Sequence, residues 1–204
     1  KIKSNFIISG PLNSYFIEKN KKNSFKYDIM YISEYRHNEK NIFYLDFQKS
    51  VITQLSEFCQ KNKLKLLIAC NAKRTDKNLN INEELQFYKT NNVIASYTNK
   101  SSYKYIPDVK ILFCLKSNLG IEALFAGKPI IFINHYDDYL KKNIICPYIK
   151  KNSSFSIKYT NSQIKLDKLR KLINLGNSQL INLFQKSLKQ PHRFINKKDN
   201  LSYF

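Results

Sequence analysis

The hexapeptide SNLGIE, which starts at Ser117, has the residue types of a phosphate-binding helix start. Serine favours the N-cap position, and Asn118, Leu119 and Gly120 would then present backbone N–H groups without helical partners. These donors and the helix dipole attract a phosphate. Gly120 would leave space for a phosphate or a sugar, and Glu122 would accept hydrogen bonds from two ribose hydroxyls. The same residues also fit an ordinary strand–helix–strand unit with a plain cap.

Four further side chains follow predicted strands and carry groups that can bind anions or sugars. Arg36 and Arg74 are two of only four arginines, and a guanidinium suits bidentate contact with a diphosphate. Lys73 stands beside Arg74. His135 follows the run PIIFIN and can form a hydrogen-bonded cluster with the aspartates that follow it. Each of these side chains also fits an ordinary solvated loop.

The sequence predicts neither a metal site nor a resident cofactor. The four cysteines, at 59, 70, 114 and 146, are spaced too widely for a zinc pattern. No paired-carboxylate motif follows a predicted strand. Cys70 and Cys114 lie in apolar runs, where a thiol behaves as a small hydrophobic group. We therefore expect reduced thiols that belong to the core.

Apolar runs alternate with helical stretches along most of the chain. We expect strands at residues 6–9, 27–33, 64–70, 92–96, 110–115 and 129–134. Helical spacing of apolar residues predicts helices at 47–61, 82–90, 117–126, 166–175 and 177–189. Strands that are apolar throughout and separated by helices indicate a parallel sheet covered on both faces. The predicted fold is therefore α/β, a doubly wound Rossmann-like parallel sheet.

Ligands of such a sheet bind beyond the carboxyl ends of the strands, where the strand order reverses. We therefore expect the ligand edge to consist of the loops 33–38, 71–77, 116–120 and 134–138. The stretch 136–159 is rich in Lys, Asn and Ser, and its weak periodicity predicts a long loop. Residues 1–135 would form the ligand-binding domain, and 136–204 a loop and C-terminal helices packed on that domain.

Several segments resemble one enzyme family. SNLGIEALFAGKPIIF, at 117–132, resembles the donor-site motif of GT-B glycosyltransferases, an S-x-x-G-x-E-A-L pattern followed by G-K-P. Other segments resemble, in the same order, those of bacterial surface-carbohydrate-biosynthesis transferases: FIISGPLNSYFIEKN (6–20), ISEYR (32–36), KLLIACNAKR (65–74), EELQFY (83–88) and SY (102–103). The resemblance extends from about residue 6 to residue 134 and is much weaker from residue 136 onward.

The resemblance implies one half of a GT-B architecture, the half that binds a nucleotide-sugar donor. The donor, which is a substrate and not a cofactor, would then contact Arg36, Lys73, Arg74, Ser117, Asn118, Leu119, Gly120, Glu122 and His135. A saccharide or lipid-linked acceptor would bind to an N-terminal acceptor domain. A two-domain transferase needs a considerably longer chain, so we expect either that this chain is a piece of the enzyme or that a partner supplies the acceptor half.

One position departs from the family pattern. Cys114 stands where many retaining GT-B enzymes carry the first of two glutamates. The sequence therefore assigns no catalytic residue and leaves open whether the sugar configuration is retained or inverted. Two other functions also remain open: an epimerase-like enzyme acting on nucleotide-sugars, and a non-catalytic nucleotide- or carbohydrate-binding module.

The chain carries 35 lysines and arginines against 15 acidic residues, a formal net charge of +20. Nearly all the basic residues are lysines, whereas nucleic-acid readers favour arginine, so we disfavour nucleic acid as a partner. We expect a diffuse positive surface with peripheral contact with anionic membranes. The apolar runs are shorter than the roughly 20 residues that cross a bilayer. No signal segment is recognisable, which predicts a cytoplasmic protein, at most peripheral at the inner membrane face.

Overall fold

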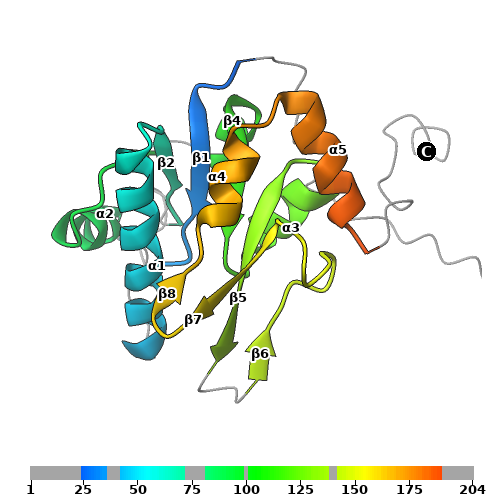
Figure 1. Cartoon of the computed structure of the whole chain (residues 1–204). Helices are drawn as coiled ribbons and strands as arrows, with labels where there is room; N and C mark the ends of the chain where they lie inside the picture. The colour runs from blue at the N-terminus through cyan, green and yellow to red at the C-terminus, as the bar shows by residue number, and fades with distance from the viewer. Residues whose placement is uncertain (1–23, 36–41, 72–80, 99–100, 138–141, 190–204) are drawn as a thin grey trace, which may run out of the picture.

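The computed structural model describes residues 24–35, 42–71, 81–98, 101–137 and 142–189. These residues form one sheet with helices on both faces (Figure 1). The strands are β1 (Tyr27–Ile32), β2 (Leu66–Ala69), β3 (Ser96–Tyr97), β4 (Val109–Cys114), β5 (Ile130–Asp137), β6 (Lys142–Ile144), β7 (Ser156–Thr160) and β8 (Gln163–Ile164). The helices are α1 (Ile42–Lys61), α2 (Ile81–Thr90), α3 (Asn118–Phe125), α4 (Asp167–Ile173) and α5 (Asn177–Ser187), with a 3₁₀ helix, η2 (Ser102–Asp108).

The strand order is β3–β2–β1–β4–β5–β7–β8, and β6 pairs with β5. Strands β3, β2, β1, β4, β5 and β7 are parallel, whereas β6 and β8 are antiparallel to their neighbours. The chain moves outward from β1 through β2 to β3, and then returns to the other side of β1 with β4. The strand order therefore reverses between β1 and β4. This arrangement confirms the predicted doubly wound, Rossmann-like α/β fold.

The central strands are buried on both faces, as expected for a parallel sheet between helices. Helices α1 and α4 lie in front of the strands in Figure 1, and α3 lies behind them. Side chains alternate between the two faces along a strand. In β5, Ile130 faces Gly120 of α3, whereas His135 stacks on Phe47 of α1. Even-numbered residues of β5 therefore face α3, and odd-numbered residues face α1.

Helix α3 begins and ends where the sequence predicts. Ser117 is its N-cap residue and Ala126 its C-cap residue. Gly127 follows with φ of +79°, a conformation that favours glycine. The N–H groups of Gly127 and Lys128 donate to the carbonyls of Leu124 (2.9 Å) and Ala123 (3.0 Å). This pair of bonds is a Schellman motif, which satisfies the last carbonyls of the helix and turns the chain into β5.

The prediction of a long loop at 136–159 is wrong. Strand β5 continues to Asp137, and β6 and most of β7 also lie within this stretch. The predicted boundary at residue 135 therefore falls inside a strand, and the described residues after it join the same sheet. Strand β7 has the sequence SIKYT, and only its first two residues are buried. Because β7 lies near the edge of the sheet, it lacks the apolar run that marks the central strands.

Other differences are small or cannot be compared. The strand predicted at 92–96 is β3, two residues long and further along the chain, and η2 was not predicted. The strand predicted at 6–9 lies outside the described residues. None of the helices in the described ranges is both long enough and apolar enough to cross a membrane.

Candidate functional site

The start of α3 lies at the edge where the parallel strands end, one strand away from the end of β1. Ser117 has φ of −63° and ψ of 140°, and its side chain makes no capping hydrogen bond. The N–H of Ile121 donates a hydrogen bond to the carbonyl of Ser117 (3.2 Å) across the helix start. The N–H groups of Asn118, Leu119 and Gly120 precede this bond, so they have no carbonyl within the helix to bond to. The predicted helix start is confirmed, and phosphate binding to it stays a prediction.

Gly120 has a different role from the one expected. The residue is buried, and a Cβ built on it would lie 2.6 Å from Sγ of Cys114 and 3.1 Å from Cδ1 of Ile130. The missing side chain therefore lets α3 pack closely on β4 and β5. The expectation that Gly120 leaves open space for a phosphate is wrong, because side chains of β4 and β5 occupy that space.

The carboxylate of Glu122 is mostly buried, with 9% of the residue exposed. It accepts a hydrogen bond from the hydroxyl of Tyr103, at the start of η2. Tyr103 belongs to the SY pair of the family resemblance, so the structure brings together two of the quoted segments. Contact between Glu122 and a ribose stays a prediction.

His135 lies inside β5, not after it, and 6% of the residue is exposed. Its ring stacks on Phe47 of α1, with ring centroids 4.2 Å apart, and Tyr159 of β7 packs against the same phenylalanine at 4.6 Å. His135 thus lies on the α1 face of the sheet, whereas Glu122 belongs to α3 on the other face. The structure places the two residues toward the same edge but does not bring them together.

The predicted donor contacts Arg36, Lys73 and Arg74 lie outside the described residues. The last described residues before them, Tyr35 and Asn71, lie just after the ends of β1 and β2. The side-chain amide of Asn71 donates to the carbonyl of Tyr35 (2.8 Å).

Glu34 is a site residue that sequence reasoning missed. It follows β1, and its Oε1 accepts a hydrogen bond from the N–H of Lys116 at the end of β4 (2.5 Å). Its Oε2 accepts one from the hydroxyl of Tyr44 in α1 (2.5 Å). The ammonium of Lys116 lies 4.7 Å from the centroid of the Tyr44 ring. Burial and the Glu34 carboxylate raise the pKa of Tyr44, so the phenol stays protonated as a donor. The only sequence signal was a carboxylate directly after a buried strand.

A second carboxylate, Glu84 of α2, is fully buried beside the end of β1. Its Oε1 accepts hydrogen bonds from the hydroxyl of Ser33 (2.5 Å) and from the N–H of Asn71 (3.0 Å). The hydroxyl of Tyr88 donates to Ser33 Oγ (2.5 Å). Glu84 and Tyr88 are four residues apart, which places them on one face of α2. The EELQFY segment therefore connects α2 by hydrogen bonds to the ends of β1 and β2.

Two buried polar atoms near this edge have no hydrogen-bond partner among the described residues: the hydroxyl of Tyr31 and Oε1 of Gln48. Tyr31 is in β1, and the amide nitrogen of Gln48 in α1 lies 3.5 Å from the carbonyl of Glu34. Burial, and then the charge of Glu34, raise the pKa of Tyr31 well above its usual value. Buried polar atoms without a partner favour the binding of a small polar molecule, such as a buried water molecule.

The cysteines are not linked to one another. Burial raises the pKa of both Cys59 and Cys70 to about 12, which keeps them as thiols at neutral pH. In the part of the chain that the structure describes, no group of three or more His, Cys, Asp or Glu side chains is placed to hold a metal ion.

Comparisons of the chain with protein-family models, with curated proteins and with solved structures found no match in any of the three. The fold and the position of the candidate site define a Rossmann-like α/β domain. Any narrower class is a proposal that depends on the site itself.

Proposed function

We propose that the chain binds a nucleotide-sugar and forms the donor-binding half of a GT-B glycosyltransferase that builds surface polysaccharide or glycolipid. One observation carries this proposal: the helix with the sequence NLGIEALF starts at the end of β4, where the strand order reverses between β1 and β4. Ligands of doubly wound sheets bind at this place. The resemblance of the same segment to a donor-site motif adds the chemical class of the ligand.

The helix start supplies groups that suit a diphosphate. The side chain of Ser117 is not used for capping, and the first N–H groups of α3 have no helical acceptor. The positive end of the helix dipole adds to their attraction for an anion. Lys116 is exposed directly before the helix and adds a cation at the same edge. Such donors stabilise the negative charge of a departing nucleotide.

Glu122 would contact the ribose hydroxyls. The hydrogen bond from Tyr103 fixes its carboxylate, and a carboxylate accepts several hydrogen bonds at once. The acceptor, a saccharide or a lipid-linked saccharide, would bind to an N-terminal domain, which would also supply the catalytic base of an inverting enzyme. The four cysteines that form no disulfide fit a reducing compartment and support a cytoplasmic location.

The substitution Asn118→Pro tests the helix start with little change elsewhere. Asn118 is the first residue of α3, where proline is well tolerated, and Ser117 already has the extended backbone that precedes proline. The change removes one N–H donor and leaves the rest of the helix. Asn177→Pro is a matched control, because Asn177 is the first residue of α5 and follows Gly176 with φ of −62° and ψ of 156°.

Isothermal titration calorimetry of the full-length protein with UDP-, dTDP- and CMP-sugars would measure donor binding. We expect at least one donor to bind, Asn118→Pro to weaken it by about 10- to 100-fold, and Asn177→Pro to leave it unchanged. Equal binding by the wild type and Asn118→Pro would show that the phosphate does not contact this helix start. Binding of no member of the panel would reject the donor-binding function.

A further inference from the structure

The C-terminal part of the described chain is strongly basic. Residues 142–189 contain ten lysines and arginines but a single acidic residue, Asp167. Thirteen of the 15 acidic residues of the chain lie before residue 139. The positive charge is therefore not spread evenly, and the elements from β6 to α5 carry a disproportionate share of it.

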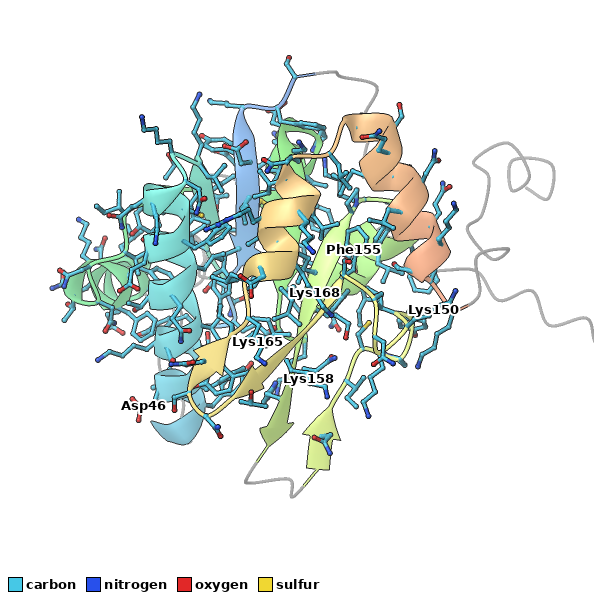
Figure 2. The ribbon with its side chains drawn as sticks, viewed as in Figure 1. Asp46, Lys150, Phe155, Lys158, Lys165 and Lys168 are labelled. Carbon is cyan, nitrogen blue, oxygen red and sulfur yellow. The ribbon has the colours of Figure 1, made fainter. Side chains whose placement is uncertain are left out.

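Two segments of this part pair with each other at the end of α5. Ile149 forms an antiparallel bridge with Leu188, and the N–H of Lys189 donates to the carbonyl of Tyr148 (3.0 Å). The ammonium of Lys150 donates to the carbonyl of residue 186 (2.8 Å). Figure 2 shows Lys150 beside the end of α5. The pairing therefore gathers three exposed lysines, at positions 150, 186 and 189, around one helix end.

Exposed apolar side chains accompany these lysines. Tyr148 is 40% exposed and Leu183 is 39% exposed, and among the described large hydrophobic residues only Ile94, at 66%, is more exposed. Leu183 precedes Lys186 by three residues, so the two are neighbours on the surface of α5. The ring of Tyr148 packs edge-on against Phe125, with centroids 5.2 Å apart, which holds it in place. We call Tyr148, Lys150, Leu183, Lys186 and Lys189 the basic apolar surface.

We propose that the basic apolar surface docks on a membrane of anionic phospholipids. The lysine ammonium groups match the negative headgroups in charge, and their long apolar stems can lie against the interface. Tyrosine and leucine side chains enter the boundary between headgroups and acyl chains. The cations of this surface are lysines, which bind diffuse negative charge without the bidentate geometry that base recognition uses. The inference depends on charge and exposure and is independent of donor binding.

Co-sedimentation of the full chain with vesicles tests this surface. The vesicles are pure phosphatidylcholine, or phosphatidylcholine with phosphatidylglycerol. The test variants are Lys186→Glu/Lys189→Glu and, separately, Leu183→Ser. The control is Lys61→Glu/Lys89→Glu, which makes the same change in net charge at exposed positions of α1 and α2. Thermal unfolding of each variant shows whether it is folded.

We expect the wild type to bind the anionic vesicles and not the neutral ones, and to be released by salt. Lys186→Glu/Lys189→Glu should lower the partition coefficient by about tenfold or more, and the control variant should lower it by much less. Leu183→Ser should also weaken binding, because it removes apolar area and no charge. No binding to anionic vesicles at low salt would overturn the proposal, as would equal losses in the test and control double variants. Tighter binding of a duplex DNA probe that displaces the vesicles would assign the surface to nucleic acid instead.

Discussion

Gly120 of α3 lies directly against Cys114 of β4, so closely that a Cβ at position 120 would be 2.6 Å from the sulfur atom. Cys114 is a buried thiol, and its burial raises its pKa. This position therefore serves the packing of the helix that carries the candidate phosphate site.

The contact predicts that Gly120→Ala destabilises the protein. Alanine is the better helix former by about 0.5–1 kcal/mol, but the overlap with Cys114 should cost about 1–3 kcal/mol. The added Cβ also meets Ile130 at 3.1 Å, so the neighbours cannot all move away freely. Urea unfolding measures the net change in the free energy of unfolding.

A second substitution, Cys114→Ala, provides the control for this contact. Removal of the sulfur should make Gly120→Ala less costly in the double variant, with a coupling energy of about 0.5–3 kcal/mol. Strictly additive effects of the two substitutions would contradict the close approach of α3 and β4.

Two buried tyrosines near the end of β1 should respond in opposite ways to loss of the hydroxyl. The hydroxyl of Tyr88 donates to Ser33, whereas that of Tyr31 has no partner among the described residues. Tyr88→Phe should therefore lower the free energy of unfolding by about 1–2 kcal/mol. Tyr31→Phe should leave it unchanged or raise it by up to about 2 kcal/mol, because an unsatisfied buried hydroxyl is costly.

Thermal and denaturant unfolding of both variants, compared with the wild type, measure these changes. If Tyr31→Phe destabilised the protein as much as Tyr88→Phe does, the Tyr31 hydroxyl would have a partner, such as a bound water molecule. A ligand that bonds to the Tyr31 hydroxyl would likewise bind more weakly to Tyr31→Phe than to the wild type.

Lys128 makes the stability depend on pH. The residue is 6% exposed, and its burial lowers the pKa to about 7 from 10.5, against the opposing charge of Asp108. Between about pH 7 and pH 10.5 the unfolded chain holds this proton but the folded chain does not. This group therefore raises the free energy of unfolding with pH in that window, by up to about 1.4 kcal/mol per unit. Below about pH 7 both states are protonated and the dependence disappears.

Urea unfolding of the wild type and Lys128→Met between pH 6 and pH 9 would test this dependence. Methionine has a similar shape and does not titrate, so the difference between the two proteins isolates Lys128. The difference in the free energy of unfolding should be constant near pH 6 and should shift in favour of the wild type above pH 7. A difference that does not change with pH would show that Lys128 keeps an ordinary pKa in the folded protein.

Local chemistry was enough to predict much of the fold. The start of α3 after Ser117 and its end at Gly127 follow from the residues at those positions, because capping groups act within a few residues of the chain. The central strands were predicted because a strand buried on both faces needs an unbroken apolar run. Strand β7 was missed because only its first two residues are buried, and its remaining residues resemble those of a loop.

The side-chain arrangement of the candidate site depended on tertiary structure. The sequence showed that Gly120 has no side chain, but only the packing of α3 on β4 decides that the sheet fills that space. The sequence placed His135 at the ligand edge, but the alternation of side chains along β5 puts its ring on the α1 face of the sheet. Glu34 and Lys116 are 82 residues apart, and they meet because β1 and β4 are neighbours in the sheet. Helix caps and apolar periodicity depend on short stretches of chain, whereas a contact between two strand ends depends on the strand order of the whole sheet.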